Sequence, residues 1–239
     1  GGYVQWSGTL QPYIKSWSIF VSPGDRVGGL APTCYTGNNL GAGAPGGQTP
    51  QASCAGIQDV QAPRLSYTAN SLLMPRKRKS DDPMNTVSES VLEEPSNTIL
   101  VTAMTDVPAC INGTSVASGT AFKTHRPANA ILLGDNGAPF QGEALAEVGL
   151  PSYYAISATR AKADIKSCEG GTPAAGLSHI TYAKPNRFGD GSNYVFSDTS
   201  ARFMQLEKTL DARSFKWGKR AYTAGGGAII APGTSTPVQ

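Results

Sequence analysis

The chain has 239 residues, a formal net charge of +3 and 15% charged residues, which is below the roughly 25% usual in soluble domains. This length suffices for one sizeable core, and so small a net charge predicts no electrostatic partner. Glycine (28) and proline (17) are abundant, and aromatic and β-branched residues are spread along the whole chain. The composition therefore argues against disorder and favours β-structure joined by long polar loops.

The first segment, residues 3–21, is expected to form a compact unit. Large apolar residues recur in it at helix-like spacing: Trp6, Leu10, Tyr13, Ile14 and Trp17. Pro12 is expected to interrupt this helix or to start a turn of it, because proline lacks the N–H that a helix interior needs. Ile19-Phe20-Val21 then predicts a short buried strand, which ends at the turn-forming residues 22–25.

The next part of the chain alternates between loops and strands. Residues 24–63 hold much of the glycine and proline and predict a long structured loop, since loops of this length are usually functional or covalently tied. The alternating residues 65–70 predict a strand. A short helix is predicted over residues 88–94, and the apolar, β-branched residues 98–103 predict the central strand of a sheet.

The C-terminal third has the most regular pattern. One strand is predicted around Ile180 and Tyr182. Residues 193–197 and 201–206 are predicted to pair as an antiparallel hairpin, because Asp198-Thr199-Ser200 between them has turn chemistry. Three aromatic residues are expected to cover the sheet: Phe215, Trp217 and Tyr222.

Together these elements predict an α+β fold with an antiparallel sheet, little helix and long loops. We expect one globular head over residues 1–224, with loop insertions near 24–63 and 112–150. The second insertion contains a predicted buried strand at residues 130–133. Residues 225–239 are rich in Gly, Pro and Thr and predict a flexible tail.

Four cysteines occur, at Cys34, Cys54, Cys110 and Cys168, and none has the C-x2-C spacing of a zinc site. An even number in glycine- and asparagine-rich loops favours two disulfides and therefore an oxidising compartment. Pairing Cys34 with Cys54 would leave Cys110 with Cys168, but three pairings are open. Four free, buried thiols in a cytosolic protein are the alternative.

The densest charge run is Arg76-Lys77-Arg78-Lys79, which is followed at once by Asp81 and Asp82. A nucleic-acid or membrane patch is one interpretation of such a run. A solvated loop whose charges neutralise locally is the favoured interpretation, so we expect no nucleic-acid partner.

Groups that would support catalysis are sparse. His125 and His179 have no nucleophile motif near them and are interpreted as packed or surface side chains. Several carboxylates are interpreted as solvated or turn residues: Glu89, Glu93, Glu94, Asp135 and Glu143. Residues 225–227 are three glycines with no Lys-Ser/Thr pair after them, so phosphate binding is unsupported. No catalytic residue is predicted.

One stretch is a candidate for metal binding. Asp190-Gly191-Ser192-Asn193, together with Asp198, offers hard oxygen ligands in a glycine-bearing loop, which suit calcium. The EF-hand pattern is absent, and ordinary turn chemistry is the alternative. Asp190 and Asp198 are therefore the calcium candidates, and no other cofactor is expected.

Several segments resemble, in the same order, segments of the pseudopilin-like proteins. Residues 6–25 read W-x-x-x-L-x-P-Y-I-K-S-W-x-I-F-x-S-P-x-D, similar to the stretch after the signature helix in that family, with Ser22 where the family commonly has cysteine. Residues 65–71, L-S-Y-x-x-N-S, resemble a strand of the family. Residues 94–100, E-P-S-N-T-I-L, resemble the entry into the next strand.

The C-terminal hairpin carries the most specific likeness. One branch of the family has a histidine, nine residues and then Asp-Gly; here Phe188 is followed by nine residues and then Asp198-Thr199. The residues that match this signature are Gly191, Asn193, Tyr194, Phe196 and Asp198. The signature His and Gly have become Phe188 and Thr199. Residues 206–210 and 215–222 also resemble family endings.

The resemblance touches residues 3–25, 65–103 and 180–222. It implies a pilin-like head with an antiparallel sheet, facing outward on a filament whose core is built from long, hydrophobic N-terminal helices. This chain opens Gly1-Gly2-Tyr3, without that helix and without a signal peptide. Three explanations stay open: a chain trimmed for solubility, a processed product, or a helix that lies on another polypeptide.

The function expected is that of a structural subunit of a type II secretion or type IV pilus-like filament, not an enzyme. The implied partners are other copies or related subunits and, through the absent helix, inner-membrane assembly machinery. The implied location is the periplasm, cell surface or exterior of a bacterium, with membrane anchoring before assembly.

Two functions of other classes stay open. A minor pilin or adhesin that binds a glycan or protein would expose Tyr35, Tyr153 and Tyr154 around a cleft. A secreted hydrolase would bring His125 or His179 to a serine or carboxylate in a cleft.

Overall fold

Two four-stranded sheets form the frame of the protein. The computed structural model describes residues 6–30, 62–74, 87–112, 128–140, 152–171, 174, 176–222 and 225–239. Within these ranges the chain is a mixed α+β protein with antiparallel sheets and few helices, as the sequence predicts.

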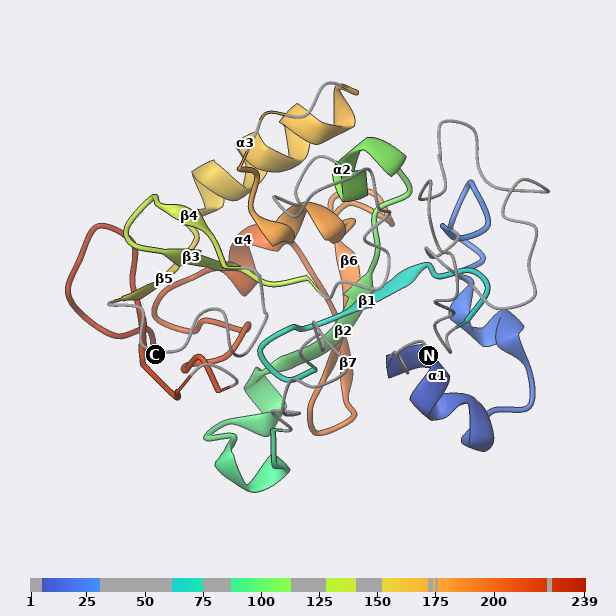
Figure 1. Cartoon of the computed structure of the whole chain (residues 1–239), viewed down its shortest axis with the longest axis horizontal. Helices are drawn as coiled ribbons and strands as arrows, with labels where there is room; N and C mark the ends of the chain where they lie inside the picture. Colours follow the sequence, from blue (N-terminus) through green and yellow to red (C-terminus); the bar gives the residue numbers. More distant parts are fainter. Residues whose placement is uncertain are drawn as a thin grey trace, which may run out of the picture.

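The first sheet has the strand order β1-β2-β6-β7 and is antiparallel throughout (Figure 1). Its strands are β1 (Tyr67–Ala69), β2 (Ile99–Ala103), β6 (Ser192–Phe196) and β7 (Ala201–Met204). Side chains alternate along β6, where Tyr194 and Phe196 are buried and Asn193 is exposed. The predicted central strand and the predicted hairpin are both confirmed.

The second sheet has the order β4-β3-β5-β8. Its strands are β3 (Ile131–Leu133), β4 (Ala138–Pro139), β5 (Tyr153–Ala155) and β8 (Ile229–Ile230). β3 pairs antiparallel with β4 and β5, whereas β8 joins β5 in parallel. The buried strand predicted inside 112–150 is confirmed as β3.

The longest helix in the described ranges, α3 (Ala158–Glu169), was not predicted. Ser157 begins it, because its hydroxyl accepts a hydrogen bond from the Arg160 backbone N–H. The side chains that α3 buries are Ala161, Asp164, Ile165 and Cys168. This stripe has helical spacing but only one large apolar residue, so the sequence carried little periodic signal.

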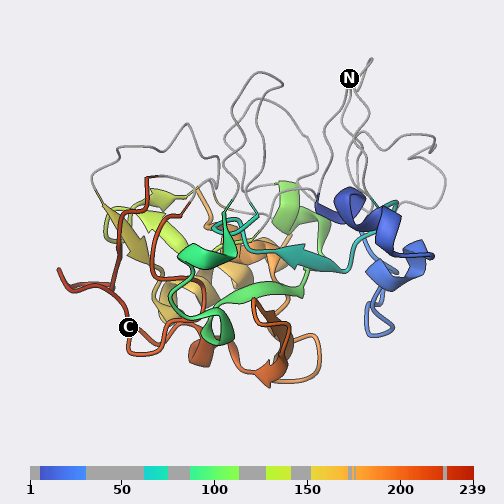
Figure 2. The same cartoon turned by 90° about the horizontal axis from the view of Figure 1, so that it is seen from below.

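The other α-helices are short. They are α1 (Trp6–Leu10), α2 (Pro108–Asn112) and α4 (Leu206–Thr209). Figures 1 and 2 both place α1 at the end of the molecule opposite to β3 and β5. The opening segment therefore lies beside the first sheet, where the Ser66 backbone N–H, next to β1, donates to the Phe20 oxygen at 2.8 Å.

One hydrophobic cluster contains buried residues of both sheets. Its largest fully buried side chains are Trp217, Tyr182, Tyr194, Phe140, Phe196 and Phe215. Phe215 and Trp217 lie in this core, as predicted, and the partly buried Tyr222 packs against it. Each fully buried large apolar side chain contributes roughly 1.5–3 kcal/mol of stability.

The strand predicted at residues 19–21 is wrong. The chain forms a 3₁₀ helix there, Trp17–Phe20, whose first turn is capped by the Ser16 hydroxyl. Phe20 is buried against two tryptophan rings, while Ile19 is 59% exposed. The cap and the ring contacts favour a turn, because a strand would need a partner strand for its backbone groups.

Two further predictions of local structure are wrong. Ile180 and Tyr182 lie on a buried 3₁₀ helix, His179–Tyr182, and not on a strand. The helix predicted over residues 88–94 is one 3₁₀ turn, Glu89–Val91. In both places a serine before the turn and short-range hydrogen bonds outweigh the periodic pattern.

The C-terminal segment, residues 225–239, is not the flexible tail that its composition predicts. It contributes β8 to the second sheet, and Val238 is buried at 6% exposure. The Val238 backbone N–H donates to the Ile229 oxygen, and the Gln239 N–H donates to the Ala212 oxygen. Backbone pairing on both sides fixes a sequence whose Gly and Thr content suggested a loop.

Candidate functional site

The segment from Phe188 to Thr199 forms one continuous hairpin arm. The Phe188 backbone N–H donates to the Gly191 oxygen at 3.0 Å, and β6 follows directly. The Thr199 N–H closes the turn on the Phe196 oxygen at 2.9 Å. Thr199 has a φ of +69°, the left-handed conformation of the residue that ends a three-residue hairpin loop. Glycine, which the pseudopilin-like signature has at the corresponding position, adopts that conformation freely.

The calcium candidates Asp190 and Asp198 lie at opposite ends of β6. The five residues of β6, which span about 13 Å at ~3.3 Å per residue, lie between their turns, so the two carboxylates do not share an ion. Asp198 accepts hydrogen bonds from the Ser200 hydroxyl and N–H at 2.6 and 3.0 Å, and these lower the pKa of its carboxyl. Asp190 accepts from Gln205 at 2.8 Å. Asp198 therefore makes ordinary turn contacts, and Asp190 is bonded to a side chain that follows β7.

No metal cluster is present elsewhere in the described ranges. Within them, no group of three or more His, Cys, Asp or Glu side chains is placed to hold a metal ion. The described part of the chain likewise contains no helix long and apolar enough to span a bilayer.

Two phenylalanine rings lie over glycines beside the hairpin. A Cβ added to Gly24 would lie 2.7 Å from the Phe188 ring, and one added to Gly191 would lie 2.5 Å from the Phe203 ring. Phe188 and Phe203 are 44% and 53% exposed. Phe188, which stands where the family has histidine, is thus an apolar surface contact with no proton to exchange.

A cluster of paired charges, buried at its centre and partly exposed at its edge, lies directly before the hairpin. The Arg187 side chain is 2% exposed and contacts Asp25 at 3.4 Å and Asp106 at 3.3 Å. Its guanidinium also donates to the Met104 carbonyl oxygen. Lys184 bridges Asp106 and Glu169 at 3.0 and 2.7 Å. We call Asp25, Asp106, Glu169, Lys184 and Arg187 the charge cluster.

Electrostatics inside the charge cluster favour its charged forms. Burial raises the pKa of Asp106, but the hydrogen bond from Lys184 and the charges of Lys184 and Arg187 hold it below its ordinary value. Burial lowers the pKa of Lys184, but its bonds to Glu169 and Asp106 raise it above the ordinary value. The cluster therefore joins the opening unit, the end of β2, the hairpin arm and α3 by paired charges.

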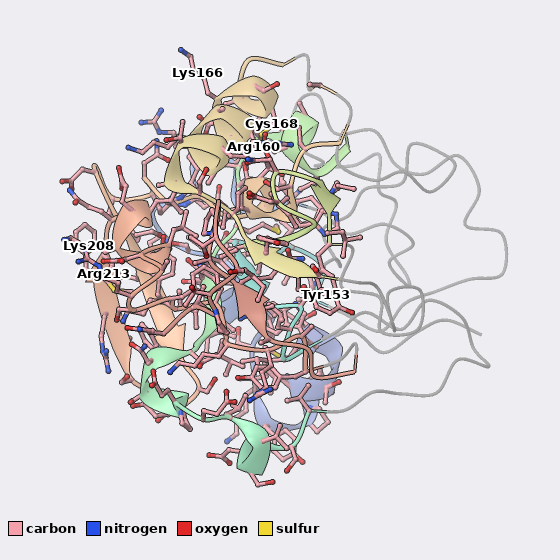
Figure 3. The ribbon with its side chains drawn as sticks, turned by 90° about the vertical axis from the view of Figure 1, so that its left-hand side faces the viewer. Tyr153, Arg160, Lys166, Cys168, Lys208 and Arg213 are labelled. Atoms are coloured by element: carbon pink, nitrogen blue, oxygen red, sulfur yellow. A yellow bond between two sulfur atoms is a disulfide. The ribbon has the colours of Figure 1, made fainter. Side chains whose placement is uncertain are left out.

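The pair Cys110 and Cys168 forms a disulfide that joins α2 to α3. Cys168 lies on the inner side of α3 in Figure 3, and both residues are buried with Leu177. This confirms one of the pairs that the sequence left open. Cys34 and Cys54 lie outside the described residues.

The described residues that were considered for catalysis do not form a relay. His179 is fully buried and stacks on Tyr182 at 5.1 Å between ring centroids. The neighbouring Ser178 hydroxyl donates to Asp164 at 2.6 Å, beneath α3 and away from solvent. Asp164 in turn pairs with Arg160 at 2.8 Å. These contacts attach α3 to the 3₁₀ helix below it.

Three of the carboxylates considered make structural contacts, and Glu89 is exposed on its 3₁₀ turn. Glu93 pairs with Arg220, and Glu94 pairs with Lys219. Asp135 accepts a hydrogen bond from the Gly233 N–H at 3.1 Å. His125, Glu143 and residues 76–82 lie outside the described residues.

The tyrosine cluster expected of a glycan-binding module is not formed by the residues that are described. Tyr153, labelled in Figure 3, is 4% exposed, and its ring packs edge-to-face against Phe140 with 5.8 Å between the ring centroids. Tyr154 is half-buried on the same strand, and Tyr35 lies outside the described residues. Burial of Tyr153 counts against that alternative.

Sequence reasoning missed the charge cluster. Asp25 and Arg187 are 162 residues apart, and nothing in their local sequence indicates that they meet. The only signal was that Asp25 closes the first resembling segment and Arg187 precedes the signature.

No family model, curated protein or solved structure matches this chain.

Proposed function

We propose that this chain is the globular head of a pilin-like, pseudopilin-type filament subunit, with a structural and not a catalytic role. The observation that carries the proposal is the convergence of the resembling segments on one sheet. Residues 65–71 contain β1, residues 94–100 lead into β2, and residues 188–199 contain β6, and these three strands are neighbours.

Side chains from the resembling segments also bond to one another. Asn70 donates to the Ile99 and Trp217 oxygens at 2.8 and 3.1 Å and accepts from the Leu72 N–H, so this buried amide is fully used. Asp25 accepts from the Ser66 hydroxyl at 2.7 Å. Segments that resemble one family in the same order along the sequence are expected to contact one another when the chain has inherited that family's fold.

The proposal assigns the molecule's partners and location. The head would lie outside the bacterial inner membrane, in the periplasm or at the cell surface, and would meet copies of itself or related subunits. An oxidising location agrees with the disulfide between Cys110 and Cys168. Polymerisation would depend on an apolar helix joined to this head, and inner-membrane machinery would act on that helix.

The test is to express the native gene with an epitope in the head and to follow processing and assembly. The expected results are cleavage by a prepilin peptidase next to an apolar helix, and labelled filaments in sheared surface fractions by immunogold electron microscopy. A gene that encodes no such helix, on this chain or an adjacent one, would contradict the proposal. So would a head found only in the cytosol.

A further inference from the structure

Three side chains from two distant parts of the sequence meet beside the start of β2. The Lys216 ammonium contacts the Asn97 side-chain oxygen directly. The Asn97 side-chain nitrogen donates to Glu94 Oε2 at 2.9 Å. Lysine, asparagine and glutamate are thus arranged so that the amide lies between the amine and the carboxylate.

The backbone holds these side chains in place. Asn97 ends the 3₁₀ helix Pro95–Asn97, and its N–H donates to the Glu94 oxygen at 2.9 Å. The Lys216 oxygen accepts from the Ile99 N–H at 2.7 Å, so the lysine backbone is bonded to the first residue of β2. Phe215 and Trp217 on either side of Lys216 are buried at 1% and 0% exposure. Such fixed geometry favours reaction between neighbouring groups.

The surroundings also favour an uncharged amine. Burial and then the charge of Arg202 lower the pKa of Lys216, against the opposite effect of Glu94 and Asp211. A lysine with a lowered pKa is a better nucleophile, because more of it carries a free electron pair.

We propose that Lys216 and Asn97 form an intramolecular isopeptide bond, with Glu94 as the proton-transferring residue. The Lys216 Nζ attacks the Asn97 Cγ; the Nζ–Cγ bond forms and the Cγ–Nδ2 bond breaks. Glu94 accepts a proton from Nζ and delivers one to Nδ2, which leaves as ammonia. The reaction needs no oxidant, reductant or other co-reactant, because an amine and a primary amide give a secondary amide and ammonia.

The bond would close a covalent loop between the start of β2 and the segment that follows α4, which are 119 residues apart. Together with the disulfide it would give the described domain a second crosslink that reducing agents do not break. The inference does not depend on filament assembly, since it concerns the folded head alone.

Mass spectrometry of the folded, purified chain tests the proposal. After complete reduction of disulfides, the intact mass is expected to fall short of the sequence mass by one ammonia. Proteolysis is expected to give one branched peptide pair joined through Lys216 and Asn97. An intact mass equal to the sequence mass would overturn the inference.

Variants separate this bond from other ammonia losses, such as succinimide formation at Asn136-Gly137. Lys216→Arg is expected to restore the full sequence mass, and Glu94→Gln is expected to lower the yield of the joined peptide. Lys208→Arg, on exposed α4, is the matched control and should keep both the joined peptide and the mass deficit. A deficit that persists in Lys216→Arg would refute the assignment.

Discussion

At the scale of single residues, the hairpin turn shows how the fold imposes a conformation on an unsuitable side chain. Asn136 and Thr199 are the non-glycine residues with positive φ in the described part of the chain. Asparagine tolerates the left-handed region, whereas a β-branched threonine is a genuine outlier there. The hydrogen bonds of Phe196 to Ser200 and Thr199 overcome that cost.

Thr199→Gly is expected to stabilise the protein by about 1 kcal/mol. Glycine removes the left-handed penalty of roughly 1–2 kcal/mol, less the entropy that it adds to the unfolded chain. The measurement is the free energy of unfolding in urea. Ala201→Gly, at the exposed start of β7, is the control and should destabilise by about 0.5–1 kcal/mol. A loss of stability in both variants would show that the turn is unstrained.

Protonation of the Asp106 carboxylate is expected to lower the stability of the folded protein at acid pH. Because its folded pKa lies below the ordinary 3.8, its stabilising contribution is present above that pH and is lost as the pH falls through the folded value. Lys184 has a raised pKa, so its contribution is present below the ordinary 10.5 and is lost as the pH rises above it. Urea midpoints measured against pH should therefore fall at both ends, and Asp106→Asn should flatten the acid side.

At the scale of elements, α3 is held in place by covalent and polar contacts more than by an apolar face. Its inner side carries the disulfide with α2 and the Asp164 carboxylate, which accepts from the Ser178 hydroxyl and N–H. Glu169 near its end belongs to the charge cluster. A helix with one large buried apolar residue thus depends on specific bonds for its position.

Replacing both Cys110 and Cys168 by alanine is expected to destabilise the protein by about 4 kcal/mol. The estimate follows from the chain entropy released when a crosslink with a sequence separation of 58 residues is removed. The measurement is urea unfolding of the two proteins without reductant. A change below about 1 kcal/mol would mean that the other contacts of α3 suffice.

The strand β8 makes the C-terminal segment part of the second sheet. Val238→Ala is expected to cost about 2 kcal/mol, because it leaves a cavity where Val238 packs in the core. Ser235→Ala, on the exposed turn of the same segment, should change stability by less than about 0.5 kcal/mol. Equal effects of the two substitutions in thermal unfolding would indicate that the segment is loosely attached.

At the scale of the whole molecule, the charge cluster joins segments that are not held together by strand pairing alone. Asp25 ends the turn that follows the opening unit (residues 3–21), Asp106 follows β2, and Arg187 leads into the hairpin. A buried charge without its partner is costly, so these segments are constrained to fold together. For a filament head, this arrangement would keep the opening unit, and a helix preceding it, at a fixed orientation to the sheet.

Arg187→Met is expected to destabilise the protein by about 3–5 kcal/mol, because it leaves Asp25 buried without its cationic partner and removes one of the two cations beside Asp106. Arg213→Met is the control, since Arg213 points outward in Figure 3 with its side chain 88% exposed. That change should cost less than about 1 kcal/mol. Denaturant unfolding followed by tryptophan fluorescence would report on both variants. Similar losses in the two would disprove the role of the cluster.

Several features of this protein followed from local sequence. Residues 98–103 became β2 because apolar, β-branched side chains suit a strand buried in a sheet. The turn chemistry of residues 198–200 placed the hairpin of β6 and β7 correctly. Cys110 and Cys168 were named as disulfide candidates, although their pairing was one of three possibilities.

The rest was decided by contacts between residues far apart in the sequence. The composition of residues 225–239 suggests a free tail, but β8 within this segment pairs with β5. The sequence does not show this pairing, because the backbone groups of a strand form their hydrogen bonds with a partner that lies elsewhere in the chain. Arg187 with Asp25, and Lys216 with Asn97, meet across more than a hundred residues. The sequence by itself determined the α+β class, the central strand and the hairpin, whose causes are local side-chain preferences. Only the tertiary structure decided the α3 contacts, the second sheet and the charged groups that meet, because their causes are burial and pairing.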